Sequence, residues 1–225
     1  MKIERVLDWF ARELEIAKFD DVSNNGLQIA GPSDVTKVAF AVDASLESVK
    51  AAAACGAQLL VVHHGISWGG GIRRLTGGVY NVVKAAMEGG VALAGYHLPL
   101  DASRKYGNNY ELARYLGLKN LKPAFSYHGN IIGVTGMNPQ GVKVGVCSGG
   151  AGEFAEEAKN LGCGLYVTGE ASWGEVIAAE NCGMEMVCAG HYATETFGVK
   201  ALARAVRAKL HVRTEFLARA TAAVV

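Results

Sequence analysis

The first hydrophobic pattern along the chain predicts an amphipathic helix over residues 3–18. Apolar residues recur there at three- and four-residue intervals, which places them on one face of a helix. A cluster of turn-forming residues follows at 23–26, and a short apolar segment at 27–30 stops at a Gly-Pro breaker. The chain therefore begins with a helix, a turn and a short strand.

Two longer apolar segments predict neighbouring strands of a parallel sheet. Residues 37–42 form a β-branched apolar run, after which a helix begins at 43–45 and ends at Gly56. The next run, at 58–62, is continuously apolar after Gln58, as expected of a strand that helices cover on both faces. It leads directly into His63-His64, so side chains able to bind metals stand at the carboxyl end of a buried strand.

The second half of the chain repeats the pattern of the first. Residues 143–146 resemble residues 37–40, and residues 162–167 resemble residues 56–61, both at an offset of 106 residues. Because the register holds through both segments, the resemblance indicates an internal duplication.

A later pair of segments agrees at a different offset. His97 corresponds to His191 and Asp101 to Glu195, in both cases 94 residues apart. The 12-residue change in offset is consistent with a glycine-rich insertion in the first half. Each half thus carries a histidine followed four residues later by a carboxylate.

These patterns predict an internally duplicated α/β fold, in which two similar lobes each have a central sheet flanked by helices. We expect a first lobe at 1–123 and a second at 124–225, with the site between them. The 225 residues, of which 50% are hydrophobic and 19% charged, are enough for a substantial core.

The charge pattern and the N-terminus bear on partners and location. A net charge of +1 without a basic run gives no reason to expect tight binding to nucleic acid or a membrane surface. The N-terminal segment lacks the apolar stretch of a secretory signal, and no window reaches the roughly 20 apolar residues of a membrane helix. We therefore expect a cytoplasmic protein. Its five cysteines lack a CxxC spacing and are expected to be buried, reduced thiols: Cys55, Cys147, Cys163, Cys182 and Cys188.

Five histidine and carboxylate residues stand at comparable ends of the predicted strands. Each has a plainer explanation when taken alone, a polar turn for the histidine pair and a common surface pair for His-x-x-x-Glu. Together they converge where open α/β sheets bind ligands, and a set without thiolate suits Zn²⁺, Fe²⁺, Mn²⁺, Co²⁺ or Ni²⁺. The candidate metal ligands are His63, His64, Asp101, His191 and Glu195.

The two histidines at the strand end could reach two adjacent metal ions. Five ligands for two ions leave coordination positions for water. Because a bound metal such as zinc lowers the pKa of water toward roughly 7, the set predicts hydrolysis by attack of hydroxide. His97 is a candidate proton shuttle or a histidine satisfied at a strand end. Glu170 falls at the position of His64 in the other half and is a candidate general base or a helix cap.

Neither a dinucleotide-binding glycine motif nor a phosphate-binding loop occurs in the sequence. A nucleotide would therefore be held by metals and basic side chains. Trp68 and Trp173 follow corresponding strand ends and are candidates for stacking on a base, with plain packing as the alternative. Four basic residues are candidates for phosphate contacts or for solvated loop positions: Arg73, Arg74, Arg104 and Lys105.

Several motifs also resemble one family over nearly the whole chain. They are Ser-Asn-Asn-Gly-Leu-Gln at 23–28, Val-Val-His-His-Gly at 61–65, His-Leu-Pro-Leu-Asp at 97–101 with Asn108-Asn109, Thr-Gly-Glu at 168–170 and Gly-His-Tyr-Ala-Thr-Glu at 190–195. In this order they resemble the GTP cyclohydrolase 1 type 2 homologue family of Nif-like dinuclear metal-centre proteins. The chain departs from that pattern after residue 170, where members often carry a further histidine.

The resemblance implies a duplicated α/β fold assembled as a toroidal hexamer, with a two-metal site facing the internal cavity. It further implies that His64 and Asp101 hold one ion, that His63 and His191 hold the other, and that Glu195 bridges both.

These observations predict a homo-oligomeric dinuclear metal hydrolase acting on a nucleotide such as GTP, or on a phosphoester, with His97 or Glu170 transferring protons. The alternative is a binding protein without catalysis: a metal carrier, a regulatory ring or a toroid that threads DNA. The near-neutral charge argues against the DNA-binding version.

Overall fold

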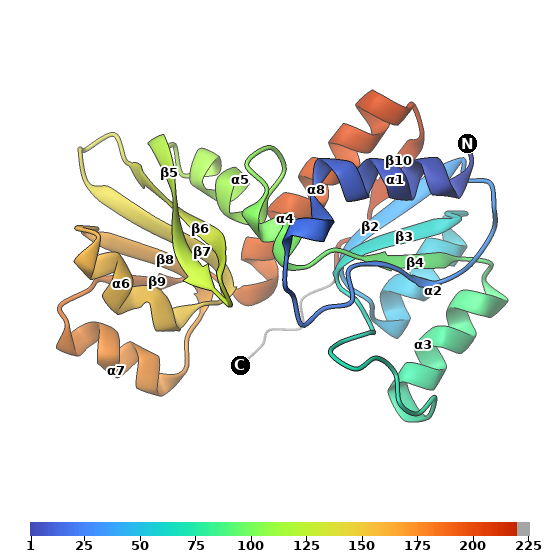
Figure 1. Cartoon of the computed structure of the whole chain (residues 1–225), viewed down its shortest axis with the longest axis horizontal. Coiled ribbons are helices and arrows are strands. Elements are labelled where there is room, and N and C mark those ends of the chain that lie inside the picture. The colour runs from blue at the N-terminus through green and yellow to red at the C-terminus, as the bar shows by residue number, and fades with distance from the viewer. Residues whose placement is uncertain (220–225) are drawn as a thin grey trace. The chain divides into compact units, whose positions relative to one another are not determined.

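A computed structural model describes residues 1–219 of the chain (Figure 1). Its strands form two five-stranded sheets, and the chain divides into two compact units. The first unit comprises Met1–His97 and the chain from Leu202 onward, and the second comprises Leu98–Ala201. Among the residues described, no helix combines the length and the apolar character that a membrane span requires.

The sheet of the first unit has the order β1-β4-β3-β2-β10. Strands β2, β3, β4 and β10 are parallel, and β1 pairs with β4 in the antiparallel direction. The strands are β1 (Gly26–Ile29), β2 (Lys37–Asp43), β3 (Leu59–His64), β4 (Ala92–Gly95) and β10 (Arg213–Phe216). This confirms the parallel strands expected from the apolar runs.

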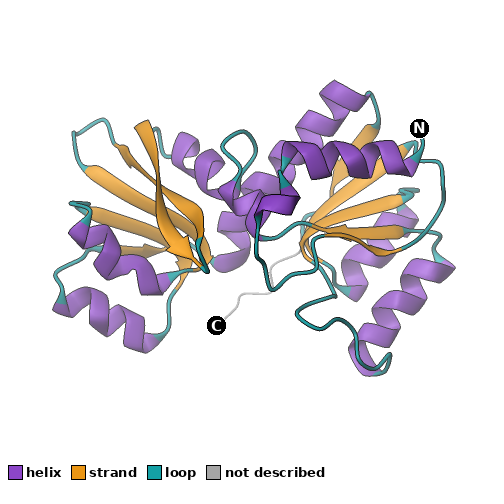
Figure 2. Ribbon diagram, in the orientation of Figure 1, coloured by secondary structure: helices purple, strands orange, loops and turns teal. Residues whose placement is uncertain are grey.

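Helices cover both faces of the first sheet, which explains why β3 is continuously apolar (Figure 2). On one face, α2 (Leu46–Ala54) and α3 (Gly77–Glu88) pack on small apolar residues of β2 and β3. On the other, Phe10 of α1 (Ile3–Glu13) lies 6.3 Å from Phe40 and 5.0 Å from Tyr96 between ring centroids.

The N-terminal helix is shorter than its hydrophobic pattern indicates. Helix α1 ends at Glu13 because Glu15 adopts a left-handed conformation, with φ of 50°. A short 3₁₀ turn, Ile16–Lys18, contains the remaining positions of the expected helix.

The sheet of the second unit has the order β5-β6-β7-β8-β9. Strands β5, β6 and β7 are antiparallel, whereas β7, β8 and β9 are parallel. The strands are β5 (Lys119–Tyr127), β6 (Asn130–Met137), β7 (Lys143–Gly150), β8 (Leu165–Glu170) and β9 (Met186–Cys188). The helical segments are α4 (Leu98–Ala102), α5 (Asn108–Tyr115), a 3₁₀ turn at Gly152–Phe154, α6 (Ala155–Asn160), α7 (Trp173–Asn181) and the start of α8 (His191–Leu210).

The two sheets confirm the internal duplication. Strands β2 and β7 begin 106 residues apart, as do β3 and β8, while β4 and β9 begin 94 residues apart. In both units these three parallel strands alternate with helices. The fold is thus an internally duplicated α/β fold with two helix-flanked sheets.

The compact units divide the chain at other positions than the lobes expected at 1–123 and 124–225. Pro123 lies inside β5, and α4 and α5 pack on β6, so residues from Leu98 belong to the second unit. Later, β10 pairs with β2, which returns the chain to the first sheet. The last six residues of the expected second lobe, 220–225, lie outside the described residues.

The cysteines agree only in part with the expectation of buried thiols. All five are free, and burial raises the pKa of the Cys147 and Cys163 thiols. The expected burial is wrong for Cys188, which is exposed, and Cys55 and Cys182 are half-buried. Cys188 ends the short strand β9, whose pairing is with β8 alone in the described sheet.

Candidate metal centre

Three histidines of the first unit form a cluster able to hold a metal ion. His63 and His64 end β3, and His97 follows β4, the next strand in the sheet. One ligand atom of each lies within 4.8 Å of those of the other two. The rings of His63 and His64 have centroids 4.6 Å apart and an interplanar angle of 45°. The sequence predicts the histidine pair at a strand end, and the structure shows that His97 lies beside this pair.

The three rings are held by their Nδ1 atoms. Nδ1 of His63 lies 3.0 Å from the carbonyl oxygen of Tyr96, and Nδ1 of His64 lies 2.9 Å from Oδ1 of Asp43. Nδ1 of His97 lies 3.0 Å from Oδ1 of Asp21. Metal-binding histidines usually donate one ring N–H to such an acceptor, which fixes the ring and leaves Nε2 to bind the ion. The arrangement therefore suits a divalent cation.

Asp21 holds the ring of His97 and was not among the residues that the sequence pointed to. Its side chain is 2% exposed, and besides His97 it accepts hydrogen bonds from the backbone N–H of Ser23, at 3.0 Å, and from Nδ2 of Asn25, at 2.8 Å. Burial opposes its charge, but the hydrogen bonds from His97, Asn25 and Ser23 outweigh burial and lower the pKa of Asp21 to about 2. Oδ1 of Asn25 also accepts the backbone N–H of His97, at 2.7 Å. The polar turn at 23–26 thus positions a histidine distant in sequence.

The role of Asp43 in holding the ring of His64 was also missed, although the positions of the two strand ends in the sequence pointed to it. Sequence reasoning assigned it to the start of a helix, but Ser45 caps that helix and Asp43 is the last residue of β2. Asp43 pairs with His64 in the register of β2 and β3. Aligning the ends of the two predicted strands would have brought them together.

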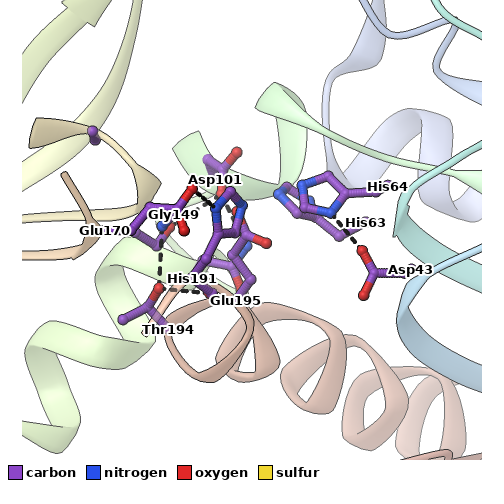
Figure 3. A network of polar contacts seen from close by, with 12 residues as sticks. Asp43, His63, His64, Asp101, Gly149, Glu170, His191, Thr194 and Glu195 are labelled. Atoms are coloured by element: carbon purple, nitrogen blue, oxygen red, sulfur yellow. Dashed lines mark hydrogen bonds and ion pairs between the residues drawn. The ribbon is translucent and has the colours of Figure 1, made fainter. Parts of the chain in front are cut away.

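In the second unit, His191 begins α8 and Glu195 lies one turn further along it, which confirms that their spacing places them on one helical face. Nε2 of His191 lies 3.1 Å from Oε1 of Glu195, and Nδ1 of His191 lies 3.0 Å from Oε1 of Glu170 (Figure 3). The Glu195 side chain is 5% exposed. The hydrogen bond to Glu195, followed by the charges of both carboxylates, outweighs burial and raises the pKa of His191 to about 9. Negative charge is therefore concentrated around this ring, as expected of a cation-binding group.

Glu170, the predicted general base, holds His191 as Asp43 holds His64. Both carboxylates end a parallel strand, and each lies within hydrogen-bond distance of Nδ1 of a histidine. This geometry favours a positioning role for Glu170.

A glycine makes room for the carboxylate of Glu195. Gly149, at the end of β7, has φ of +71°, and a Cβ at this position would lie 2.5 Å from Oε1 of Glu195. The backbone N–H of Gly149 donates to Oγ1 of Thr194, at 3.1 Å. The approach of backbone to carboxylate requires glycine here.

Asp101 lies in the short helix α4, which follows β4. It is buried, and its Oδ1 accepts from Nδ2 of Asn108, at 2.9 Å, and from Oγ of Ser148, at 3.4 Å. Oδ1 of Asn108 in turn accepts the backbone N–H of Gly198, at 2.7 Å. The asparagine therefore connects the Asp101 carboxylate to α8.

The structure thus brings His63, His64 and His97 together in one unit and Glu170, His191 and Glu195 together in the other. Of the candidate substrate contacts, Trp68 lies beside the first group, with its ring centroid 5.1 Å from that of His97. Trp173 begins α7 and is 76% exposed. The candidate phosphate contacts are all exposed: Arg73, Arg74, Arg104 and Lys105.

Comparison with known proteins gives one consistent family. The family model Duf34/NIF3 (NGG1p interacting factor 3) matches residues 1–142 and 128–222. A protein of Archaeoglobus fulgidus named GTP cyclohydrolase 1 type 2 homolog is 38% identical over 239 residues, 96% of each chain. One of the same name from Pyrococcus horikoshii is 36% identical over 246 residues, 96% of this chain and 98% of its own.

Solved structures show the same fold over the whole chain. The crystal structure of a Thermus thermophilus protein superposes with a TM-score of 0.88 at 30% identity and covers 99% of this chain and all of its own. The protein ybgI, of unknown function, superposes with a TM-score of 0.85 at 27% identity and the same coverage.

Proposed function

Because this chain belongs to the Duf34/NIF3 (NGG1p interacting factor 3) family, we propose that it is a hydrolase that depends on two divalent metal ions. The observation that carries the proposal is the way in which the rings of the histidines are held. All four that carry candidate functions hold Nδ1 against a carboxylate or a carbonyl oxygen. In His63, His64 and His191 this directs Nε2 to the ion-binding role, and in His97 it directs Nε2 to proton transfer.

The proposed ligands are those expected from the sequence: His63, His64, Asp101, His191 and Glu195. Their nitrogen and oxygen donors fit borderline divalent ions, and a hydrogen bond from Nδ2 of Asn108 holds the buried Asp101 carboxylate in place. Bound ions would supply Lewis acidity and a more acidic water, which hydrolysis at neutral pH requires. The relatives' name, GTP cyclohydrolase 1 type 2 homolog, supports a nucleotide as the substrate.

The other residues of the site have supporting roles in this proposal. His97, held by Asp21, transfers a proton through Nε2 to or from the substrate. Asp43 and Glu170 keep the rings of His64 and His191 in the tautomer that leaves Nε2 unprotonated.

Metal content tests this function directly. We would purify wild type, Glu195→Ala and the exposed control Glu185→Ala without added metal and measure the ions bound per chain. The same samples would be assayed for hydrolysis of GTP and of p-nitrophenyl phosphate. Two ions per chain in wild type and control, lost with hydrolysis in Glu195→Ala, would support the proposal.

Two other results would contradict it. A wild-type chain that is free of metal and cannot be reloaded would leave the histidines structural. A chain that binds metal, hydrolyses neither compound and yields its ions rapidly to a competing apo-protein would instead be a metal carrier.

We also propose that the protein acts as a homo-oligomer, the toroidal hexamer that the resemblance implies. Light scattering coupled to size-exclusion chromatography measures the mass against the 23.6 kDa of one chain. A monomer at micromolar concentration would contradict this.

A further inference from the structure

We propose that Trp68 and the two arginines that follow it recognise the substrate as a nucleotide. The indole stacks on a planar heterocyclic base, and Arg73 and Arg74 bind its phosphate. This inference rests on the proposed function, because it names the substrate class for the same site. It is carried by the position, the attachment and the charge of one loop of the first unit.

Trp68 forms part of the surface around the histidine cluster. Its ring centroid lies 5.1 Å from that of His97, at an angle of 75°, and 6.2 Å from that of His64, at 41°. At the same time the residue is 37% exposed. When a flat ring covers a large aromatic surface that is exposed beside the histidine cluster, the burial of both surfaces favours binding.

The indole is held in place. Its Nε1 donates to the carbonyl oxygen of Gly65, at 3.0 Å, and the backbone of the next residue, Gly69, donates to the carbonyl oxygen of Val22, at 2.6 Å. Trp68 and Ser23 also form an antiparallel bridge. An exposed side chain fixed in this way loses little entropy when a ligand stacks on it.

The side chain of Gln28 secures the beginning of the same loop. Its Oε1 accepts the backbone N–H groups of Ile66, at 2.7 Å, and Ser67, at 3.2 Å, while its Nε2 donates to the carbonyl oxygen of Asn24, at 2.9 Å. A Cβ at Gly65 would lie 2.2 Å from the Gln28 amide oxygen, so the loop can approach this amide only with glycine at that position. The polar segment at 22–28 therefore positions Trp68 as well as His97.

The charge of this region favours an anionic ligand. Residues 65–83 contain Arg73 and Arg74 and no aspartate or glutamate, whereas Lys84 of α3 pairs with Glu88. Both arginines are exposed and follow Trp68 on the same loop, after three glycines. Guanidinium groups form paired hydrogen bonds with phosphate oxygens. A planar base at the indole and a phosphate at the arginines together describe a nucleotide.

Tryptophan emission tests the proposal without requiring turnover. In a Trp173→Phe background the remaining tryptophans are Trp68 and the buried Trp9. We would titrate this protein with GMP, with guanosine and with ribose 5-phosphate. Quenching by the two ligands that carry a base, and none by the sugar phosphate, is the expected result.

Variants separate the two halves of the recognition. Trp68→Ala should weaken GMP binding about tenfold to a hundredfold, as expected from the loss of base stacking, whereas Trp68→Phe should retain most of it. The binding of these variants would be measured by calorimetry. Arg73→Gln/Arg74→Gln should weaken binding of GMP and leave that of guanosine unchanged.

The proposal is overturned if GMP leaves the emission of the Trp173→Phe protein unchanged, or if it binds Trp68→Ala as tightly as wild type. Failure of the hydrolase proposal gives a different result. A chain that binds GMP through Trp68 but hydrolyses nothing would support this binding site and contradict the proposed reaction. A chain that hydrolyses GTP with an unchanged KM in Trp68→Ala would support the reaction and contradict this binding site.

Discussion

The Asp21–His97 pair allows a quantitative prediction about stability. Replacing Asp21 by Asn keeps the shape of the side chain and removes its charge. Oδ1 can still accept from Ser23 and His97, but the new NH₂ group faces Nδ2 of Asn25, which loses this acceptor and keeps the carbonyl oxygen of Ser23, at 3.3 Å. We expect Asp21→Asn to destabilise the first unit.

The magnitude follows from the pKa of Asp21, which falls from 3.8 to about 2 on folding. Each pKa unit corresponds to about 1.4 kcal/mol, so the ionised carboxylate stabilises the folded state by about 2 kcal/mol at pH 7. Because the folded-state pKa is the lower one, this stabilisation is present above pH 3.8 and is lost as the pH falls through 2. The difference between wild type and variant should therefore shrink over that range.

Urea denaturation of the Trp173→Phe protein, followed by tryptophan emission, measures this effect, because Trp9 and Trp68 both belong to the first unit. The control is Asp34→Asn, whose carboxylate pairs with Lys2 at the surface and is 61% exposed. The control should change the unfolding midpoint little at any pH. Equal midpoints for Asp21→Asn and its parent at pH 7, or a difference that persists to pH 2, would refute the reasoning.

Three further predictions concern the second unit. Gly149→Ala should reduce metal content while far-UV circular dichroism stays unchanged, because the new methyl displaces the Glu195 carboxylate; full metal retention would contradict this. Asn108→Ala should lower the free energy of unfolding by about 2 kcal/mol in urea, since the buried N–H of Gly198 loses its acceptor; a change within error would contradict it. With chelator present, an NMR titration should give His191 a pKa of about 9, and Glu195→Gln should lower it toward 6.5. Because the folded-state pKa is raised, the associated stabilisation is present below pH 6.5 and is lost as the pH rises through 9; an unshifted pKa in wild type would contradict this.

The hydrophobic pattern along the chain was sufficient to predict the duplicated α/β fold. The apolar runs that become β2 and β3 are long and β-branched, and their copies β7 and β8 recur at a constant offset. Hydrophobic periodicity of this kind reflects burial, which is the largest favourable contribution to folding. The placement of His63-His64 at a strand end follows from the same pattern.

The contacts that hold the candidate functional side chains, in contrast, could be found only in the folded chain. Asp21 anchors His97 across 76 residues, and Asp43 anchors His64 across 21 residues. Hydrogen bonds between single polar groups leave no periodic signal in the sequence, because they depend on which segments the folded sheet places side by side. The division into units likewise depends on a distant pairing, that of β10 with β2. Burial can be predicted from the order of apolar residues along the chain, whereas the hydrogen-bond partners of individual polar atoms are set only when the chain folds.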